Sequence, residues 1–331
     1  MRLSRRKFYK SIVVLGFFLL LTIFITNLYL SLFEAEEKYE QTKRKLEALH
    51  SYFDKFHNLS YPISYSLKFY EKYNQLPIIY IITPTNNRVE TQLADLTRMR
   101  NTLWLVPKIV WILIEDSTFK TPKITKFLKE SQLSYVHLSE QTPDDLIIRS
   151  NEKTWSKPRG VLQRNKGIDW LRENSKDIDS NGVIFFADDD NTYDIRLFEE
   201  IRYTQKVSVW PVAFVGELMY ERPICKNGKV TGWFRSWGDS RPFPIDMAGF
   251  AINLRLLLAH PSARFSNLVQ RGMQESHLLS HLISVNELEP KADNCTKIFV
   301  WHTNTRKILR FGEKRLQQMN LKYDQYILDQ V

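Results

Sequence analysis

Cysteine is scarce in this sequence, which has only Cys225 and Cys295 among its 331 residues. Two cysteines cannot build the network of disulfides that holds small secreted domains together, so the fold must rely on a hydrophobic core. The sequence leaves the pairing of these two cysteines open. With 43% hydrophobic residues, the chain is long enough to bury such a core in one large or two ordinary domains.

Two kinds of ligand-binding motif are also missing. Neither GxGxxG nor GxxxxGKS/T occurs between residues 77 and 193, so any nucleotide must be held by polar groups at strand ends and by a metal ion. The zinc motif HExxH is absent too. His277 and His281 have its spacing, but Leu278 stands where the motif requires glutamate, which disfavours zinc chemistry at this pair.

The excess of positive charge is concentrated at the N-terminus. The formal net charge is +10, and the first ten residues contain five basic side chains and no acidic one: Arg2, Arg5, Arg6, Lys7 and Lys10. The rest of the chain is only mildly basic. This balance suits anionic ligands such as diphosphates, and it does not predict a nucleic-acid partner, which would require a concentrated basic face.

The segment Ser11–Phe33 carries no charged residue, and roughly 20 apolar residues suffice to cross the hydrocarbon core of a bilayer. A signal peptide has a shorter apolar region, of about 7–15 residues, and ends at a small-residue cleavage site, which does not follow Phe33. We therefore predict an uncleaved signal anchor at residues 11–33, with residues 1–10 in the cytosol and the remainder across the membrane in type II topology.

Residues 34–76 are predicted to form a stem. Glu34–Phe56 mixes charge signs, lacks glycine and proline, and places apolar residues at mostly helical spacing, which favours a helix through which two copies form a homodimer. A solvated stalk without contacts is an equal alternative. The triplets that begin at Asn58 and Asn294 fit the N-glycosylation pattern, in agreement with a secretory compartment.

From residue 77 onward, short apolar runs alternate with helical patterns. Strands are expected at 78–82, 109–114, 134–138 and 183–186, and helices at 90–103, 123–129 and 160–173. This alternation predicts a parallel sheet covered by helices on both faces, at 77–193. The other half, 194–331, is richer in aromatic residues and less regular, with strands expected at 207–215, 230–237 and 298–301. Such a composition is typical of a protein region that binds a polar, ring-shaped partner.

Three consecutive aspartates, Asp188, Asp189 and Asp190, end the apolar run of the segment Gly182–Tyr193. Ligands of open α/β sheets bind beyond the carboxyl ends of the strands, so these carboxylates are expected at the mouth of a site. Adjacent carboxylates repel one another unless a cation shares them, which indicates a hard divalent ion. The alternative is an acidic turn that caps the next helix; the missing phosphate loop favours the metal.

Other polar residues stand where a catalytic site would need them. Glu275 begins an apolar-periodic helix and is a candidate general base, although the helix dipole alone would favour glutamate there. His302 follows a predicted strand and is expected beside a phosphate or metal, or as a structural histidine. Arg159 and Arg164 can bind phosphate or a carboxylate with two parallel hydrogen bonds, or else lie on a solvated helix face.

Taken together, these pieces resemble the β-1,3-glucuronosyltransferase family, which consists of type II Golgi enzymes that attach glucuronic acid to galactose. The likeness extends from about residue 78 to residue 305. The motifs that carry it are Pro84-Thr85 with Arg88, Glu115-Asp116, Pro158-Arg159-Gly160, Gln163-Arg164-Asn165-Lys166, Phe186-Ala187-Asp188-Asp189-Asp190-Asn191-Thr192-Tyr193, Val209-Trp210-Pro211-Val212, Ser240-Arg241-Pro242-Phe243-Pro244, Asp246-Met247-Ala248-Gly249-Phe250, Glu275-Ser276, Asn294-Cys295-Thr296 and Trp301-His302-Thr303.

The resemblance implies an α/β fold of the GT-A type, a manganese ion and an inverting transfer from UDP-glucuronate to a galactose-terminated glycan or proteoglycan linker. It implies one metal ligand, Asp190, and one catalytic base, Glu275. The donor site would contain Pro84, Asp116 on the uracil, Arg159 and Arg164 on phosphate or sugar carboxylate, Asp188 without a role of its own, Asp189 on the ribose, and His302. The acceptor site would contain Glu221, Trp237, Arg241 and Asp246.

Two positions depart from the family pattern in the donor site. Asn86 stands where familiar members have an aromatic residue after Pro-Thr, and Asn304 stands where they have an arginine two residues after the histidine. These differences motivate an alternative hypothesis, in which the same scaffold uses another UDP-sugar such as UDP-xylose. A second alternative, a membrane-anchored glycan-binding scaffold without turnover, is disfavoured because such a scaffold needs neither the aspartate triplet nor Glu275.

Overall fold

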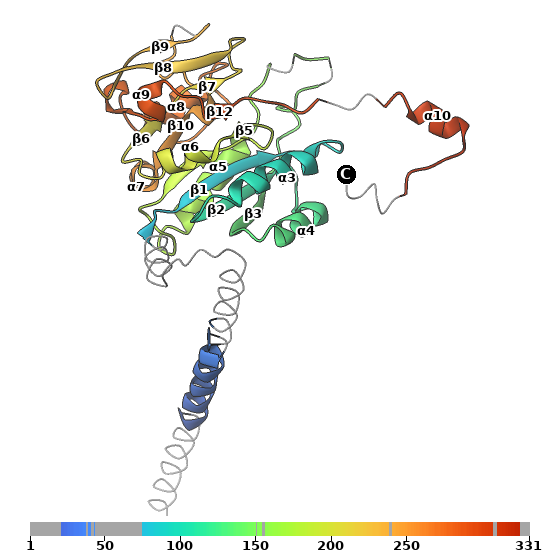
Figure 1. The fold of residues 1–331 in the computed structure, drawn as a ribbon, viewed down its shortest axis with the longest axis vertical. Coiled ribbons are helices and arrows are strands. Elements are labelled where there is room, and N and C mark those ends of the chain that lie inside the picture. The colour runs from blue at the N-terminus through green and yellow to red at the C-terminus, as the bar shows by residue number, and fades with distance from the viewer. Residues whose placement is uncertain are drawn as a thin grey trace, which may run out of the picture. The chain divides into compact units, whose positions relative to one another are not determined.

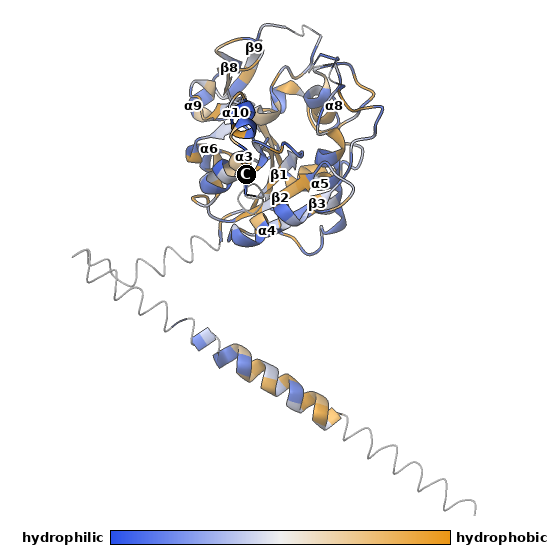
Figure 2. Cartoon of the chain, turned by 90° about the vertical axis from the view of Figure 1, so that its right-hand side faces the viewer, coloured by the Kyte–Doolittle hydropathy of each residue, from blue (hydrophilic) through white to orange (hydrophobic). Residues whose placement is uncertain are grey.

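A computed structural model of the chain describes residues 21–37, 39–40, 43, 75–149, 151–153, 156–237, 240–306 and 310–324. The chain divides into two compact units, Met1–Tyr70 and Glu71–Val331. In the first unit residues 21–37 are helical, and Figure 2 shows hydrophobic residues over the start of this helix and hydrophilic ones towards its end. Among the described residues, no helix is both long enough and apolar enough to cross a bilayer. The predicted tail at 1–10, residues 11–20 of the predicted anchor and residues 38, 41–42 and 44–74 of the predicted stem lie outside the described ranges.

The second unit is built around a seven-stranded sheet with the order β11-β6-β10-β4-β1-β2-β3 (Figure 1). One side of this sheet, as far as its edge, consists of β4 (Val183–Phe186), β1 (Ile79–Thr85), β2 (Ile109–Glu115) and the edge strand β3 (Tyr135–Ser139), and these strands run parallel. In the register, Ile79 pairs with both Ile109 and Val183. The predicted parallel sheet is therefore confirmed.

The C-terminal half contributes strands to this same sheet. The strand β10 (Phe250–Asn253) pairs antiparallel with β4 on one side and with β6 (Val207–Val209) on the other, and β11 (Glu289–Pro290) lies parallel to β6. The antiparallel strand β10 therefore connects the parallel strands β1–β4 to the strands of the C-terminal half. The whole is the mixed α/β, GT-A-like arrangement that the resemblance implies.

Successive residues of a strand point to opposite faces of the sheet, and here the residues on both faces are apolar. Helices therefore cover both faces. Ile79 and Ile81 belong to a core with α3 (Gln92–Leu103), α4 (Pro122–Glu130) and α6 (Ile195–Ile201). Tyr80 and Ile82 belong to the opposite core, with α5 (Val161–Glu173), α7 (Leu254–Ala259) and α8 (Gln274–Ser280). The helices predicted at 90–103, 123–129 and 160–173 are confirmed to within two residues.

A smaller sheet of five strands has the order β5-β12-β7-β8-β9. It contains β5 (Thr192–Tyr193), β12 (Val300–Trp301), β7 (Val212–Ala213), β8 (Tyr220–Lys226) and β9 (Lys229–Phe234). The short elements that complete the unit are η1 (Met247–Gly249), η2 (Val285–Glu287), α9 (Ala292–Cys295) and α10 (Glu313–Gln318).

Three strand boundaries in the second half were predicted wrongly. The single strand expected at 207–215 is two strands, β6 and β7, which belong to different sheets. Pro211 cannot donate a backbone hydrogen bond to a neighbouring strand. The buried indole of Trp210 donates to Ala248 O at 2.9 Å. The chain therefore passes from one sheet to the other at these two residues. The strand expected at 230–237 ends at Phe234, and that expected at 298–301 contains only Val300 and Trp301.

The structure answers the question about the cysteines, because Cys225 of β8 is bonded to Cys295 of α9 with their Cα atoms 6.1 Å apart. All four residues of α9 have positive φ angles, between 53° and 62°, so this element is a single left-handed turn. That conformation costs non-glycine residues roughly 1–2 kcal/mol each. The disulfide, together with a hydrogen bond from Ala292 N to Glu200 at 3.2 Å, ties the turn to the body of the unit.

Candidate active site

The three aspartates after β4 lie in different surroundings. Asp189 is 3% exposed and accepts hydrogen bonds from Thr85 Oγ1 and from the guanidinium of Arg88, both at 2.6 Å. Burial raises the pKa of Asp189 to about 6, although the charge of Arg88 opposes this rise. Both bonds reach the same carboxylate oxygen, Oδ2, so Thr85 at the end of β1 and Arg88 in the following loop fix the position of Asp189.

Asp188 forms an ion pair with Arg164 of α5, which is itself 7% exposed. Arg164 also donates to Arg159 O at 2.9 Å. A side chain at Gly160 would not fit beside it, because a Cβ atom there would lie 2.5 Å from Arg164 Nη1 and the φ angle is +70°. Asp188 therefore orients Arg164. The side chain of Arg159 is exposed, and only its carbonyl takes part in this contact.

Asp190 is the member of the triplet whose carboxylate is left unpaired within the described part of the chain. It is partly buried, and burial, followed by repulsion from Asp188, raises its pKa. A divalent cation would relieve both effects, since it offsets desolvation and screens the neighbouring charge. The residues present therefore fit a cation at Asp190.

The donor set also indicates what kind of cation would fit here. Within the described ranges, no group of three or more histidine, cysteine, aspartate or glutamate side chains is arranged to hold a metal ion. Hard cations such as Mg²⁺ are commonly bound through one or two carboxylates, water and the phosphates of a substrate, and Mn²⁺ accepts the same oxygen ligands. One free carboxylate, Asp190, fits an ion that is shared with a diphosphate.

The end of β2 lies at the same edge of the sheet. The Asp116 carboxylate accepts from the backbone N–H of Thr142 at 2.7 Å and from its hydroxyl at 2.8 Å. The preceding Glu115 is 4% exposed and is held by His137 at 2.6 Å and by Thr121. Pro84 pairs in register with Ile114. The structure thus brings Pro84 and Asp116 to the strand ends that also carry the triplet.

Glu275 occupies the first turn of α8 on the acceptor side of the unit. Burial raises its pKa to about 7, the Asp246 carboxylate adds to this rise, and Arg241 opposes it. The next residue, Ser276, accepts from Phe243 N at 3.1 Å and donates to Phe243 O at 3.0 Å. The start of α8 is therefore fixed against the loop that carries Arg241 and Asp246, and Glu275 has the pKa of a base that works near neutrality.

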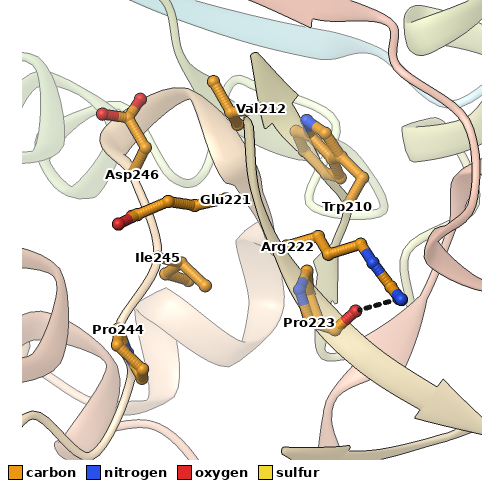
Figure 3. Close-up of a pocket in the computed structure, with 8 residues that line it drawn as sticks. All are labelled: Trp210, Val212, Glu221, Arg222, Pro223, Pro244, Ile245 and Asp246. Atoms are coloured by element: carbon orange, nitrogen blue, oxygen red, sulfur yellow. Dashed lines mark hydrogen bonds between the residues drawn. The ribbon is translucent and has the colours of Figure 1, made fainter. Parts of the chain in front are cut away.

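Two further carboxylates stand near this base. Figure 3 shows the side chains of Glu221 and Asp246 extending from β8 and from the loop before η1 towards the same side, with Val212 and Ile245 in the surrounding wall. Glu221 is 5% exposed and accepts from Ser236 N at 3.3 Å. Asp246 caps η1 by accepting from Ala248 N at 2.9 Å. Both carboxylates are therefore held in place by the protein itself.

Trp237 and Arg241 form a stacked pair beside Glu275. The guanidinium carbon of Arg241 lies 4.1 Å from the centre of the Trp237 ring, which is within cation–π range. The ring also lies on Gly272, where the φ angle is +74° and any Cβ atom would collide with the indole. Only glycine fits at this position, three residues before the candidate base.

His302 joins the two halves of the site. Its Nδ1 lies 3.3 Å from Asp246 Oδ2, and this hydrogen bond is the main reason that its pKa is raised to about 9. The charges of Asp188 and Asp190 act in the same direction. These carboxylates therefore favour the protonated form of His302, which lies between the aspartate triplet and Asp246.

The predicted site residues fall into two adjoining groups, one at the strand ends around the aspartate triplet and one around Glu275, and Arg159 reaches the first group only through its carbonyl. The structure also adds two that the sequence did not single out, Asp95 and Arg98 of α3. No local pattern marks them, because α3 reads as an ordinary amphipathic helix and their contacts with Asp190 and Thr305 join segments that are distant in sequence. The rings of His277 and His281 meet edge to face with their centres 4.9 Å apart, without a third metal ligand in the described part of the chain.

Comparison with known proteins places this geometry in a family. The profile of glycosyltransferase family 43 matches residues 99–306. Human galactosylgalactosylxylosylprotein 3-beta-glucuronosyltransferase 3 is 47% identical over 252 residues, which cover 73% of this chain and 75% of that protein.

Two further relatives agree with this assignment. Human galactosylgalactosylxylosylprotein 3-beta-glucuronosyltransferase 1 is 50% identical over 241 residues, or 72% of each chain. The rat enzyme numbered 2 in the same series is 49% identical over 236 residues, or 71% of each chain. The family profile covers the aspartate triplet, Glu275 and His302, and the chain belongs to glycosyltransferase family 43.

Proposed function

We propose that this protein is an inverting β-1,3-glucuronosyltransferase that transfers glucuronic acid from UDP-glucuronate to the 3-hydroxyl of a terminal galactose on a proteoglycan linker or a related glycan. The names of the relatives support this reaction. The observation that carries it is Glu275, a partly exposed carboxylate beside Asp246 and Arg241 whose pKa is raised to about 7, chiefly by burial. Inversion needs one base and no enzyme nucleophile.

The donor would bind along the strand ends. Asp116 would contact the uracil, Pro84 would lie beside it, and the Asp189 carboxylate would accept from the ribose. Arg159, Arg164 and His302 would bind the diphosphate or the sugar carboxylate. Asp190 would hold a Mn²⁺ ion, which stabilises the negative charge that develops on the departing UDP. Asp188 would keep Arg164 in position.

The acceptor would bind against Glu221, Arg241 and Asp246, with a sugar ring near Trp237. Glu275 would take the proton of the acceptor 3-hydroxyl as that oxygen bonds to the anomeric carbon of the glucuronate. The bond from this carbon to the UDP oxygen breaks on the opposite face, and its electron pair leaves with UDP. One in-line displacement of this kind inverts the anomeric configuration.

For the whole chain we propose a type II protein of the Golgi membrane, with a tail at 1–10, an anchor at 11–33, a stem at 34–76 and a luminal catalytic region at 77–331. The support is the uncharged segment Ser11–Phe33 with its basic N-terminal flank. A helical stem would bring two copies together as a homodimer. The mildly basic catalytic region favours an anionic nucleotide sugar and no nucleic acid.

The reaction is tested with the full-length protein in detergent. UDP-glucuronate, UDP-xylose and UDP-glucose are offered with Galβ1-3Gal or Galβ1-4GlcNAc, in Mn²⁺ or in EDTA. We expect transfer from UDP-glucuronate alone, lost in EDTA and restored by Mn²⁺. Transfer only from another donor would overturn the donor assignment, and undiminished transfer in EDTA would overturn the metal. Glycan binding without product from any donor would support the scaffold alternative.

The pH dependence of the reaction should report the ionisation of Glu275. A base must be deprotonated to accept a proton, and the Glu275 pKa is raised to about 7. Activity at limiting acceptor is therefore expected to fall about tenfold per pH unit below this value and to level off above it. Initial rates between about pH 5 and 8 measure this, and a flat profile across that window would contradict Glu275 as the base.

A further inference from the structure

The helix α3 carries a buried carboxylate that the proposed reaction does not use. Asp95 is 1% exposed. It accepts from Arg88 at 3.3 Å, from Arg98 at 3.0 Å and from Thr305 Oγ1 at 2.5 Å. A carboxylate this deeply buried needs charged partners, and the two guanidinium groups supply them. Asp95 thus binds side chains from three segments: the loop after β1, its own helix and the segment after β12.

Arg98 extends this cluster to the aspartate triplet. Its Nη2 atom donates to Asp190 O at 3.0 Å as well as to Asp95. Its Nη1 atom lies 3.4 Å from Thr305 Oγ1. The hydroxyl of Thr303 donates to the same Asp190 carbonyl at 2.7 Å. The backbone of Asp190 is therefore held from two sides, by α3 and by the residue that follows His302.

These contacts extend a connection that the smaller sheet already makes. Asp190 follows β4 of the seven-stranded sheet, and two residues later β5 pairs antiparallel with β12, so that Thr192 lies opposite Trp301, the residue before His302. The strand pairing begins at Thr192, and the side chains of α3 contact the segments on either side of it. Arg98 and Asp95 span this junction, because Arg98 contacts both the triplet and Thr305, and Asp95 contacts Thr305 directly.

We propose that Asp95 and Arg98 are positioning residues that set Asp190 and the His302 segment in the geometry needed to bind a divalent ion together with a nucleotide diphosphate. This inference rests on the proposed function of the same site. The planar guanidinium suits the role, since it donates to a carboxylate and a carbonyl at once from fixed directions, which the single ammonium group of lysine does not reproduce.

The test measures binding as well as turnover, on full-length protein in detergent. Arg98→Ala is compared with wild type for the affinity of UDP by calorimetry, once with Mn²⁺ and once with EDTA. Changes in residues that orient metal ligands commonly lower metal affinity or activity by about 10–100-fold. We expect Arg98→Ala to weaken UDP binding by about this factor in Mn²⁺ and by much less in EDTA. The KM for donor should rise, and the KM for acceptor should stay constant.

Three further variants separate this role from a general effect on folding. Arg100→Ala removes a guanidinium from the same helix, where it lies over the Phe127 ring 5.7 Å away, and should bind UDP like wild type. Arg98→Lys should restore little of the Mn²⁺ effect, and Asp95→Asn should reproduce it. Because the Arg98 side chain is 42% exposed, its variants are expected to fold even where Asp95→Asn does not.

Unchanged UDP affinity in Arg98→Ala would overturn the proposal. So would equal weakening with Mn²⁺ and EDTA, or a matching rise in acceptor KM, since either would indicate a diffuse structural role. The proposed function fails in a different way: wild-type protein would then bind UDP with Mn²⁺ without transferring glucuronate, and the effect of Arg98→Ala on UDP binding could still be measured.

Discussion

Replacing Glu275 by glutamine is expected to lower the rate of transfer by about a hundred- to ten-thousand-fold, the range in which general bases contribute to catalysis. Glutamine has nearly the same shape, but its amide cannot accept the proton of the acceptor hydroxyl. The start of α8 should stay in place, because Ser276 binds both backbone polar atoms of Phe243. The loss should therefore be one of chemistry and not of folding.

Single-turnover transfer and UDP calorimetry together measure this prediction. The Glu275→Gln protein should bind UDP with Mn²⁺ as wild type does, since Glu275 lies on the acceptor side. Glu130→Gln, at the exposed end of α4, is the matched control and should transfer at the normal rate. If Glu275→Gln keeps more than about a tenth of wild-type activity, another residue is the base.

The donor half of the fold could be predicted because its signals are local. Ile79 and Ile81 enter one core and Tyr80 and Ile82 the other, so the strand appears in the sequence as a continuous apolar run. Because ligands of parallel sheets bind at the carboxyl ends of the strands, the run that precedes the triplet is enough to predict a site there. Conversion of that prediction into a donor site for a UDP-sugar depended on the family resemblance.

What the sequence did not reveal depends on contacts between distant segments. Asp95 and Thr305 are 210 residues apart, and nothing near either residue indicates that they meet. The pairing of Cys225 with Cys295 is of the same kind, as is the contact of Trp210 with Ala248, which divides one expected strand into two. The different contacts of the three aspartates likewise follow from the positions of Arg88 and Arg164, which lie on other segments.

Because the Asp190 carboxylate alone in the triplet lacks a basic partner among the described residues, its replacement is expected to have the second large effect on transfer. Asp190→Asn should reduce Mn²⁺-dependent transfer by about a hundred- to a thousandfold, the loss seen when one preorganised electrostatic group that stabilises a transition state is removed. The amide retains one oxygen but no charge, so the divalent ion binds weakly. The fold should be little affected, because it is the carbonyl of Asp190, not its carboxylate, that Thr303 and Arg98 hold.

The decisive measurement is UDP affinity with and without Mn²⁺. In wild type the ion should strengthen binding, whereas in Asp190→Asn the two affinities should be nearly equal, since the ion has lost its protein ligand. Asp177→Asn, at an exposed position after α5, provides the matched control. Asp190→Asn protein that keeps a normal Mn²⁺ effect would show that the ion is bound elsewhere. Asp188 would then be the first residue to test, because its carboxylate, paired with Arg164, is the nearest alternative in the triplet.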